Sequence, residues 1–393
     1  MRRCRPALYR LSKEGNTPIA TGLRKFDWLS VFVGLSCVPA LAADSQPGAV
    51  PPVNAGRLSD HSWSELGCGP GDVGAKNRTL SFGLEGAMRT APQQTSPIDV
   101  MPIQEEEVVT GAISNICLGH YDRAMGNLND MVLYGHVQSQ ALLFRALRVR
   151  GMLYSLEGDF DHAIDDFSRA IEDNPRSDVV FVDRAIAYEN KGDSTHAVAD
   201  FTEAVRLNPQ NGEAYLNRGM LYARAHDFDD ALPDLDEAIR IVPHDPIALI
   251  DRGTTRQLKG DNAAALQDFD TAITDNPQAW IAYHDRCELR ARMGQDLDKA
   301  LADCNTDLAQ RPSNLPTLAS RAFVYLRLAR YDDAIVDAST CISANAHVAT
   351  AYFLRGVAKL RKGDKVGGES DLAEAAQRDP RVVAAFAAFG VTP

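Results

Sequence analysis

The chain lacks the sequence patterns by which most enzymes and nucleic-acid-binding proteins are recognised. It has no nucleophile elbow, no HExxH zinc motif and no phosphate-binding loop between a strand and a helix. Basic residues are also in deficit, because 41 Lys and Arg face 53 Asp and Glu, for a net charge of −12. Nucleic-acid binding needs a basic face. We therefore predict no nucleic-acid partner, and an enzyme with an unrecognised site is the disfavoured alternative.

Cysteine is sparse, and its spacing argues against a zinc site. The seven cysteines form no CxxC pair and no cluster with histidine. Glycine clusters once, in GCGPG at residues 67–71, which follows no predicted strand and so fails as a phosphate-binding loop. We predict no metal site and no cofactor.

Long apolar runs are also missing. The run from Trp28 to Ala42 has 15 residues, short of the roughly 20 that a membrane-spanning helix needs. It follows two basic residues and ends in a small-x-small triplet, which is typical of a cleaved signal peptide over residues 1–43. A translation start near Leu23 would shorten its basic region. We predict export to the bacterial periplasm or secretion, with a cytoplasmic or inner-membrane-anchored protein as the alternative.

The next segment, residues 44–104, is rich in proline and glycine and has no helical periodicity. It cannot bury enough apolar surface to offset its ordering entropy, so we predict a disordered linker. Residues 105–140 then carry two apolar helical stretches, at about 105–118 and 121–134, that echo the later sequence. We predict a degenerate leading repeat there, because terminal repeats are atypical.

What the chain has in abundance is repetition. A unit of 34 residues, once lengthened to 35, occurs seven times between residues 144 and 382. The residue that closes each unit is proline, or alanine once: Pro175, Pro209, Pro243, Pro277, Pro312, Ala346 and Pro380. A fixed period of this size makes each unit pack on its neighbours alone, so the sequence predicts a solenoid.

Each unit is predicted to form two helices, A and B, joined by a turn such as Gly192-Asp193. With the proline counted as position 32, positions 8, 20 and 27 are mostly small, and position 24 is mostly Phe or Leu. Small residues let two helices approach closely, while large ones fill the groove between them. This pattern resembles the tetratricopeptide repeat over about 240 residues. The resemblance implies an all-α, right-handed superhelical solenoid of antiparallel helix pairs, whose A helices line a concave groove.

The last three units depart from the pattern. Position 24 becomes Cys304 and then Ala338, and position 27 becomes Asp307 and then Cys341. We therefore expect looser packing there than in the earlier units. Cys287, at position 8, and Cys304 are the best candidates for a disulfide in an exported protein. Two buried thiols are an equally good interpretation, because both positions favour small or apolar residues.

Two charged positions recur in all seven units. Position 7 is always arginine and position 23 always aspartate. Position 7 lies on the packed face of helix A, where an unpaired arginine would lose roughly several kcal/mol by desolvation. We interpret the two positions as a structural ion-pair ladder rather than a repeated anion site, with pairs either within a unit or across a boundary. Its members are Arg150, Arg184, Arg218, Arg252, Arg286, Arg321 and Arg355, with Asp166, Asp200, Asp234, Asp268, Asp303, Asp337 and Asp371.

One face of helix A is left to meet a partner. At 100° per residue, positions 2, 5, 6, 9 and 13 lie opposite the packed positions 4, 7, 8 and 11. The middle units carry apolar residues on this face, and several units carry arginine at position 13. The predicted partner groove consists of Arg148, Met152, Val182, Ile186, Leu216, Met220, Ile250, Thr254, His284, Arg224 and Arg292. The alternative is that superhelical curvature buries part of this strip.

Methionine and branched residues on an accessible concave face suit an apolar helix or extended segment. We therefore predict a non-enzymatic scaffold or adaptor whose partners are proteins or peptides. The family's carboxylate-clamp members use Lys and Asn in their first unit and Lys and Arg in their third. This chain has Arg148 and Met152, then Glu213 and Asn217, at those positions, so capture of chaperone tails is disfavoured.

The chain end, residues 383–393, is predicted to be a truncated A helix that caps the last B helix. A capping helix normally has a polar outer side, but this one has almost none. The hypothesis that follows is a weak homodimer through the C-terminal end.

Overall fold

The computed structural model describes residues 101–118, 120–134, 139–345 and 347–393. The predicted signal peptide and nearly all of the predicted linker lie outside these ranges. Within them, no helix combines the length and apolar character needed to cross a membrane.

The regular structure of the described residues is helical throughout, and successive helices form hairpins. In chain order the helices are α2 (Met101–Cys117), α3 (Tyr121–Asn129), a π-helical turn (Asp130–Tyr134), α4 (Gln140–Glu157), α5 (Phe160–Asp173), α6 (Asp178–Lys191), α7 (Ser194–Leu207), α8 (Gly212–Arg224), α9 (Phe228–Ile241), α10 (Pro246–Lys259), α11 (Asn262–Asp275), α12 (Trp280–Met293), α13 (Leu297–Gln310), α14 (Leu315–Arg327), α15 (Tyr331–Ala344), α16 (Ala349–Lys362), α17 (Lys365–Arg378) and α18 (Val382–Ala387). The pairs from α4/α5 to α16/α17 are the seven units, and α2/α3 precedes them. Helix α2 begins inside the segment predicted to be a linker.

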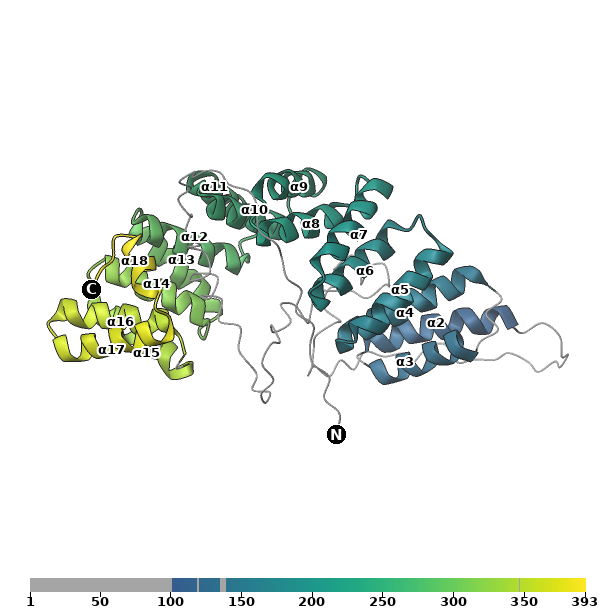
Figure 1. Cartoon of the computed structure of the whole chain (residues 1–393), viewed down its shortest axis with the longest axis horizontal. Coiled ribbons are helices and arrows are strands. Elements are labelled where there is room, and N and C mark those ends of the chain that lie inside the picture. Colours follow the sequence, from purple (N-terminus) through teal and green to yellow (C-terminus); the bar gives the residue numbers. More distant parts are fainter. Residues whose placement is uncertain (1–100, 119, 135–138, 346) are drawn as a thin grey trace, which may run out of the picture.

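The hairpins stack into an arch (Figure 1). In its middle, α8 and α10 lie on the inner side and α9 and α11 on the outer side. The A helices of these units therefore face the hollow of the arch, as the all-α solenoid predicted from the sequence requires.

The turn between helices A and B depends on one residue with positive φ, at position 15. Gly192, with φ of 87°, ends α6, and Asp193 then caps α7 by accepting a hydrogen bond from the His196 amide at 3.1 Å. Glycine supplies this left-handed conformation without strain. In two units His226 and Ala329 adopt it instead, with φ of 61° and 57°.

Packing within a unit explains why position 8 is small. A Cβ atom on Gly253 would lie 2.7 Å from the ring of Phe269, and one on Gly151 would lie equally close to Phe167. Both rings, at position 24, are fully buried. Each aromatic side chain thus fills the space that a small residue on the facing helix leaves open.

The expectation of looser packing in the last three units is wrong. Their buried apolar residues form one continuous cluster that runs from Cys287 to Val391. Where position 24 loses its aromatic ring, Cys287 and Cys304 form a disulfide across α12 and α13, with Cα atoms 5.6 Å apart. Aromatic residues of the A helices and of the chain end, among them Phe353 and Phe386, complete the core. In these units the disulfide and aromatic rings from other positions therefore replace the usual contact between a position-24 ring and a small residue at position 8.

Candidate binding surface on the A helices

The arginine at position 7 holds its own unit together and also reaches the preceding one. In the third unit, Arg218 donates from Nε and Nη2 to the two carboxylate oxygens of Asp234, at 2.7 and 2.8 Å. Its Nη1 donates to Oγ1 of Thr202, 3.0 Å away on α7 of the preceding unit. The hydrogen bond to Asp234 raises the pKa of Arg218 although burial opposes this.

All seven units repeat this arrangement. The carboxylate pairs lie within units: Arg150–Asp166, Arg184–Asp200, Arg218–Asp234, Arg252–Asp268, Arg286–Asp303, Arg321–Asp337 and Arg355–Asp371. The third bond crosses to the preceding hairpin, onto Asn129, Ser168, Thr202, Asp236, Asp270, Asn305 and Ser339. The sequence analysis overlooked these acceptors. Their signal was a short polar residue at position 25 of every unit from Ser168 to Ser339.

The ladder leaves little room for an external anion. Its arginine side chains are only 6–22 % exposed, and aromatic rings of the same helix cover several of them. The Arg184 guanidinium, for example, lies 5.6 Å from the ring centroid of Phe181 and 5.9 Å from that of Tyr188. A bidentate, desolvated pair of this kind is a packing element, so we place the ligand-binding surface elsewhere.

The predicted apolar groove requires a correction. Met152, Val182, Ile186 and Ile250 are only 1–8 % exposed, so they offer almost no surface to a partner. Successive A helices such as α8 and α10 contact one another. Val182 and Ile186, at positions 5 and 9 of α6, belong to a buried cluster that also includes Ala214 and Leu221 of α8. Curvature therefore buries part of the strip, which was the alternative interpretation.

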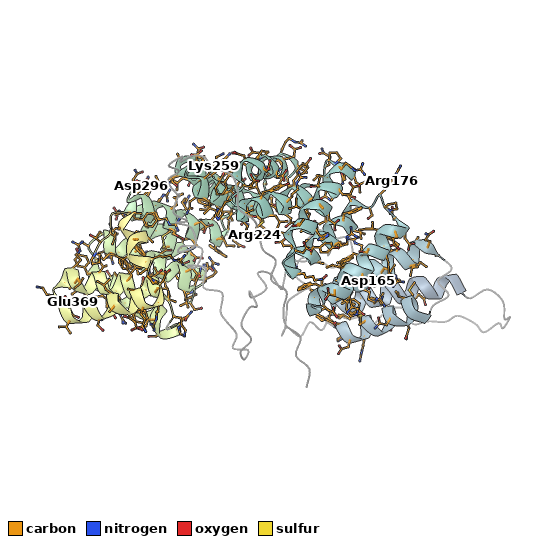
Figure 2. The ribbon with its side chains drawn as sticks, viewed as in Figure 1. Asp165, Arg176, Arg224, Lys259, Asp296 and Glu369 are labelled. Carbon is orange, nitrogen blue, oxygen red and sulfur yellow. A yellow bond between two sulfur atoms is a disulfide. The ribbon has the colours of Figure 1, made fainter. Side chains whose placement is uncertain are left out.

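Several charged residues of the predicted groove are bound to neighbouring units. Arg148 donates to Asp183 at 2.7 Å, which joins the first two units. Arg224 lies 2.5 Å from Glu189 of the preceding unit. Figure 2 shows Arg224 on the inner side of the arch, opposite outward-lying residues such as Arg176. The position-13 arginine of the third unit thus joins two neighbouring units.

The accessible part of the concave face lies in the third to fifth units. Leu216, Met220 and Thr254 remain partly exposed. Ile247 and Ile281, at position 2 of α10 and α12, are 36 % and 52 % exposed. These two isoleucines were absent from the predicted groove, although position 2 belongs to the same helix face. These five residues belong to the predicted face and present apolar atoms to solvent.

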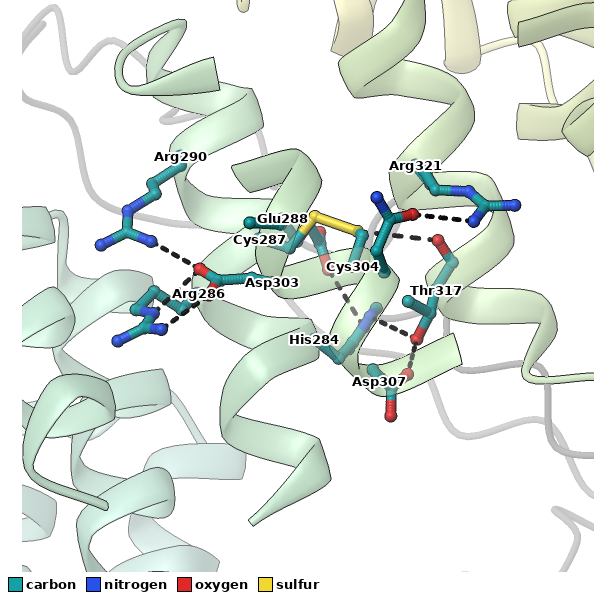
Figure 3. The surroundings of a disulfide bond; sticks show 12 residues. His284, Arg286, Cys287, Glu288, Arg290, Asp303, Cys304, Asp307, Thr317 and Arg321 are labelled. Carbon is teal, nitrogen blue, oxygen red and sulfur yellow. Dashed lines mark hydrogen bonds and ion pairs between the residues drawn. A yellow bond between two sulfur atoms is a disulfide. The ribbon is translucent and has the colours of Figure 1, made fainter. Parts of the chain in front are cut away.

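His284 is also placed differently from the prediction of a groove residue. Its Nδ1 lies 3.2 Å from the hydroxyl of Thr317, which donates to the buried carboxylate of Asp307 (Figure 3). Arg311 and Asn314 hold the same carboxylate. The Thr317 hydroxyl belongs to a residue with no exposed surface, so no substrate can reach it. This chain of hydrogen bonds joins the fifth and sixth units. It is centred on Asp307, which stands at position 27, where most units carry alanine.

We expect the stability of the folded state to depend on pH through Asp285, which follows His284 on α12. Burial raises the pKa of its carboxyl from 3.8 to about 6, with Glu288 adding to the rise while His284, Arg292 and Arg311 oppose it. The folded state thus keeps a proton that the unfolded state releases near pH 4. The stability that Asp285 contributes is present below about pH 4 and is lost as the pH rises through about 6.

We expect Asp285→Asn to raise the free energy of unfolding at pH 7.5 by about 2 kcal/mol. This is less than the full shift implies, because the side chain is 20 % exposed. At pH 4 the variant and the parent should be equally stable. Urea denaturation at the two pH values measures the difference, and an equal effect at both would refute the assignment.

A small-molecule or metal site is not evident in the described part of the chain. No group of three or more His, Cys, Asp or Glu residues there is arranged to hold a metal ion. A hollow of about 690 Å³ between the first two units is lined by Pro175, Arg176, Glu203, Arg206 and Leu207. The Arg206 guanidinium in this hollow already pairs with the Glu203 carboxylate, 2.5 Å away. Its charge is therefore compensated within the chain.

Comparison with known families supports the repeat pattern. Residues 182–246, which span most of the second unit and all of the third, match the model of the tetratricopeptide repeat. The chain is a tetratricopeptide repeat protein. The tetratricopeptide repeat array extends beyond the matched segment on both sides, because the ladder and the A-to-B turn recur from α4 to α17.

Solved structures of similar fold share little sequence with this tetratricopeptide repeat protein. A tetratricopeptide repeat protein from Parabacteroides merdae ATCC 43184 is 18 % identical, covering 74 % of this chain and 100 % of that one, with a TM-score of 0.42. Yeast Tom70 is 18 % identical over 77 % of this chain and 66 % of its own, with a TM-score of 0.45. PilW, a type IV pilus biogenesis factor, is 20 % identical over 52 % and 94 %, with a TM-score of 0.47. No curated protein matches the sequence.

Proposed function

We propose that this protein is an exported, non-enzymatic scaffold that holds segments of partner proteins on the concave face of its third to fifth units. The observation that carries the proposal is the exposed apolar surface of Ile247 and Ile281, together with the partly exposed Met220 on the same predicted face. The ladder arginines and Arg224 are engaged within the chain. An apolar, extended or helical protein segment is therefore the partner that this face suits best.

Three observations support the rest of the proposal. The Cys287–Cys304 disulfide is compatible with an oxidising compartment, and residues 1–43 have the pattern of a signal peptide. The net charge of −12 disfavours nucleic acid as a partner. The runner-up is the same scaffold in the cytoplasm or anchored in the inner membrane, which N-terminal sequencing of the mature protein would separate from the exported form.

Photo-crosslinking in living cells tests the binding face. A photoreactive residue at Met220 or at Ile281 should give discrete crosslinked products that mass spectrometry identifies as the same partner. The matched control is Val336, an apolar residue of α15 that is 62 % exposed and lies at position 22 of a B helix. Equal yields of the same products from all three positions would refute a concave binding face.

A further inference from the structure

The C-terminal helix α18 does more than close the solenoid. It contacts α16 and α17, its neighbours along the chain, but it also reaches α14 in the unit before (Figure 1). The ring of Phe386 stacks on Phe353 of α16, with centroids 4.6 Å apart, and meets Phe323 of α14 edge-on at 5.1 Å. Phe353 and Phe323 occupy positions 5 and 9, so α18 lies on the A-helix face rather than capping the last B helix alone.

The residues after α18 are held by the arginines at position 13. The Phe389 carbonyl accepts a hydrogen bond from Nη2 of Arg327, and the Arg292 guanidinium lies 5.5 Å from the Phe389 ring centroid. Arg361 donates to the carbonyl of Thr392 at 3.2 Å. Arg292, Arg327 and Arg361, one from each of the last three units, thus contact the backbone of the chain end and the ring of Phe389. The position-13 arginines of these units act as a clamp on a peptide segment.

Arg327 differs from the ladder arginines in what it contacts. Its polar contacts are the carbonyls of Phe389 and Arg292, and its guanidinium lies 5.2 Å from the ring centroid of Phe323. No carboxylate is among its contacts in the described residues. Burial lowers the pKa of Arg327. A half-buried cation whose Nη2 donates to main-chain carbonyls makes charge-assisted hydrogen bonds with groups that any peptide segment carries.

Helix α18 is too short to persist on its own. Helix α18 has six residues, fewer than the dozen or so that an isolated helix needs to persist in water. Val382, Ala385 and Phe386 are buried, whereas Ala384 and Ala387 on its outer side are exposed. We expect a short helix anchored by a few side chains to open at a lower free energy than the longer helices beneath it.

We propose that residues 382–393 are a built-in occupant of the groove of units five to seven, displaced by a partner segment that carries two aromatic side chains three residues apart. The spacing is that of Phe386 and Phe389, whose rings the groove already accepts. The inference rests on the proposed scaffold function and adds both a partner chemistry and a self-inhibited resting state.

A labelled peptide of residues 381–393, RVVAAFAAFGVTP, is the probe. The full chain carrying Phe386→Ala and Phe389→Ala should bind it at least tenfold more tightly than the parent chain does. In the parent, the tethered tail competes at an effective concentration on the order of mM. Adding Arg327→Ala to the double variant should weaken binding at least tenfold, and a probe with both phenylalanines replaced by alanine should not bind. Fluorescence anisotropy measures each affinity.

Equal binding by the parent and the double variant, or no binding by a double variant whose circular dichroism and melting are unchanged, would overturn the proposal. If the double variant does not fold, hydrogen exchange on the parent chain decides. Amides of α18 should exchange at least a hundredfold faster than those of α16, and equal protection would show that α18 is a fixed part of the core. Crosslinks from Met220 and Ile281 do not involve the tail, so they test the scaffold function separately.

Discussion

Replacing Asp234 with alanine is expected to lower the free energy of unfolding by about 3–5 kcal/mol. The substitution removes both oxygens that Arg218 binds at 2.7 and 2.8 Å. The Arg218 side chain is only 15 % exposed, so water cannot replace the lost carboxylate. What remains is an uncompensated, partly buried charge. Urea denaturation followed by circular dichroism gives the loss, and hydrogen exchange shows whether it is centred on the third unit.

Asp236 of the same helix provides a matched control. It accepts a hydrogen bond from Arg252 at 2.7 Å, yet its side chain is 54 % exposed. Asp236→Ala should therefore cost less than about 1 kcal/mol. The combination Arg218→Met with Asp234→Leu should recover most of the loss, because an apolar pair removes both charges together. Equal losses for Asp234→Ala and Asp236→Ala would contradict the ladder.

Removing the disulfide should be the second large effect. The combination of Cys287→Ala with Cys304→Ala is expected to lower the free energy of unfolding by about 3 kcal/mol. The crosslink joins residues 17 positions apart, and its loss restores conformational freedom to the unfolded chain. Small residues fit both sites, because position 8 is small in every unit and position 24 is alanine at Ala338. Denaturation with and without reductant measures the effect.

Cys341 is the control for this prediction. It is buried at position 27, where its thiol donates to the carbonyl of Leu315 at 3.6 Å. Alanine is the residue that most units carry there, so Cys341→Ala should change stability by less than about 1 kcal/mol. Reductant should destabilise the parent chain and Cys341→Ala, but leave the double alanine variant unaffected. A parent chain insensitive to reductant would show that the crosslink does not contribute.

The ladder illustrates what repetition in a sequence can establish. Seven arginines at position 7 and seven aspartates at position 23 identified the members, because a charge that recurs on a packed face must be compensated. Whether the pairs form within or between units could not be predicted. In the structure the arginine's fork meets the carboxylate of its own hairpin, and its remaining nitrogen reaches Thr202 or its equivalent in the preceding one.

The predicted groove shows that the position of a residue on its own helix does not by itself determine whether the residue is exposed. The angle of a residue about helix A indicated which face is free of the B helix, but not how closely the next A helix approaches. Val182 and Ile250 are buried in that seam, whereas Ile281 is exposed at the edge. Phe323 and Phe353 lay on the predicted face too, and the chain's own end covers them. The distance between helices from different units decides such cases.

By itself, the sequence determined the all-helical repeat, its period, its turns and the residues of the ladder. Each of these depends on contacts within one unit or between adjacent units, and those contacts recur often enough to be read from spacing. The tertiary structure alone decided which face remains open, that Cys287 and Cys304 are joined, and that α18 occupies the groove of the last units. These outcomes depend on superhelical curvature and on a contact between α18 and α14. Superhelical curvature is the sum of many small packing angles between helices, and the sequence of no single unit determines that sum.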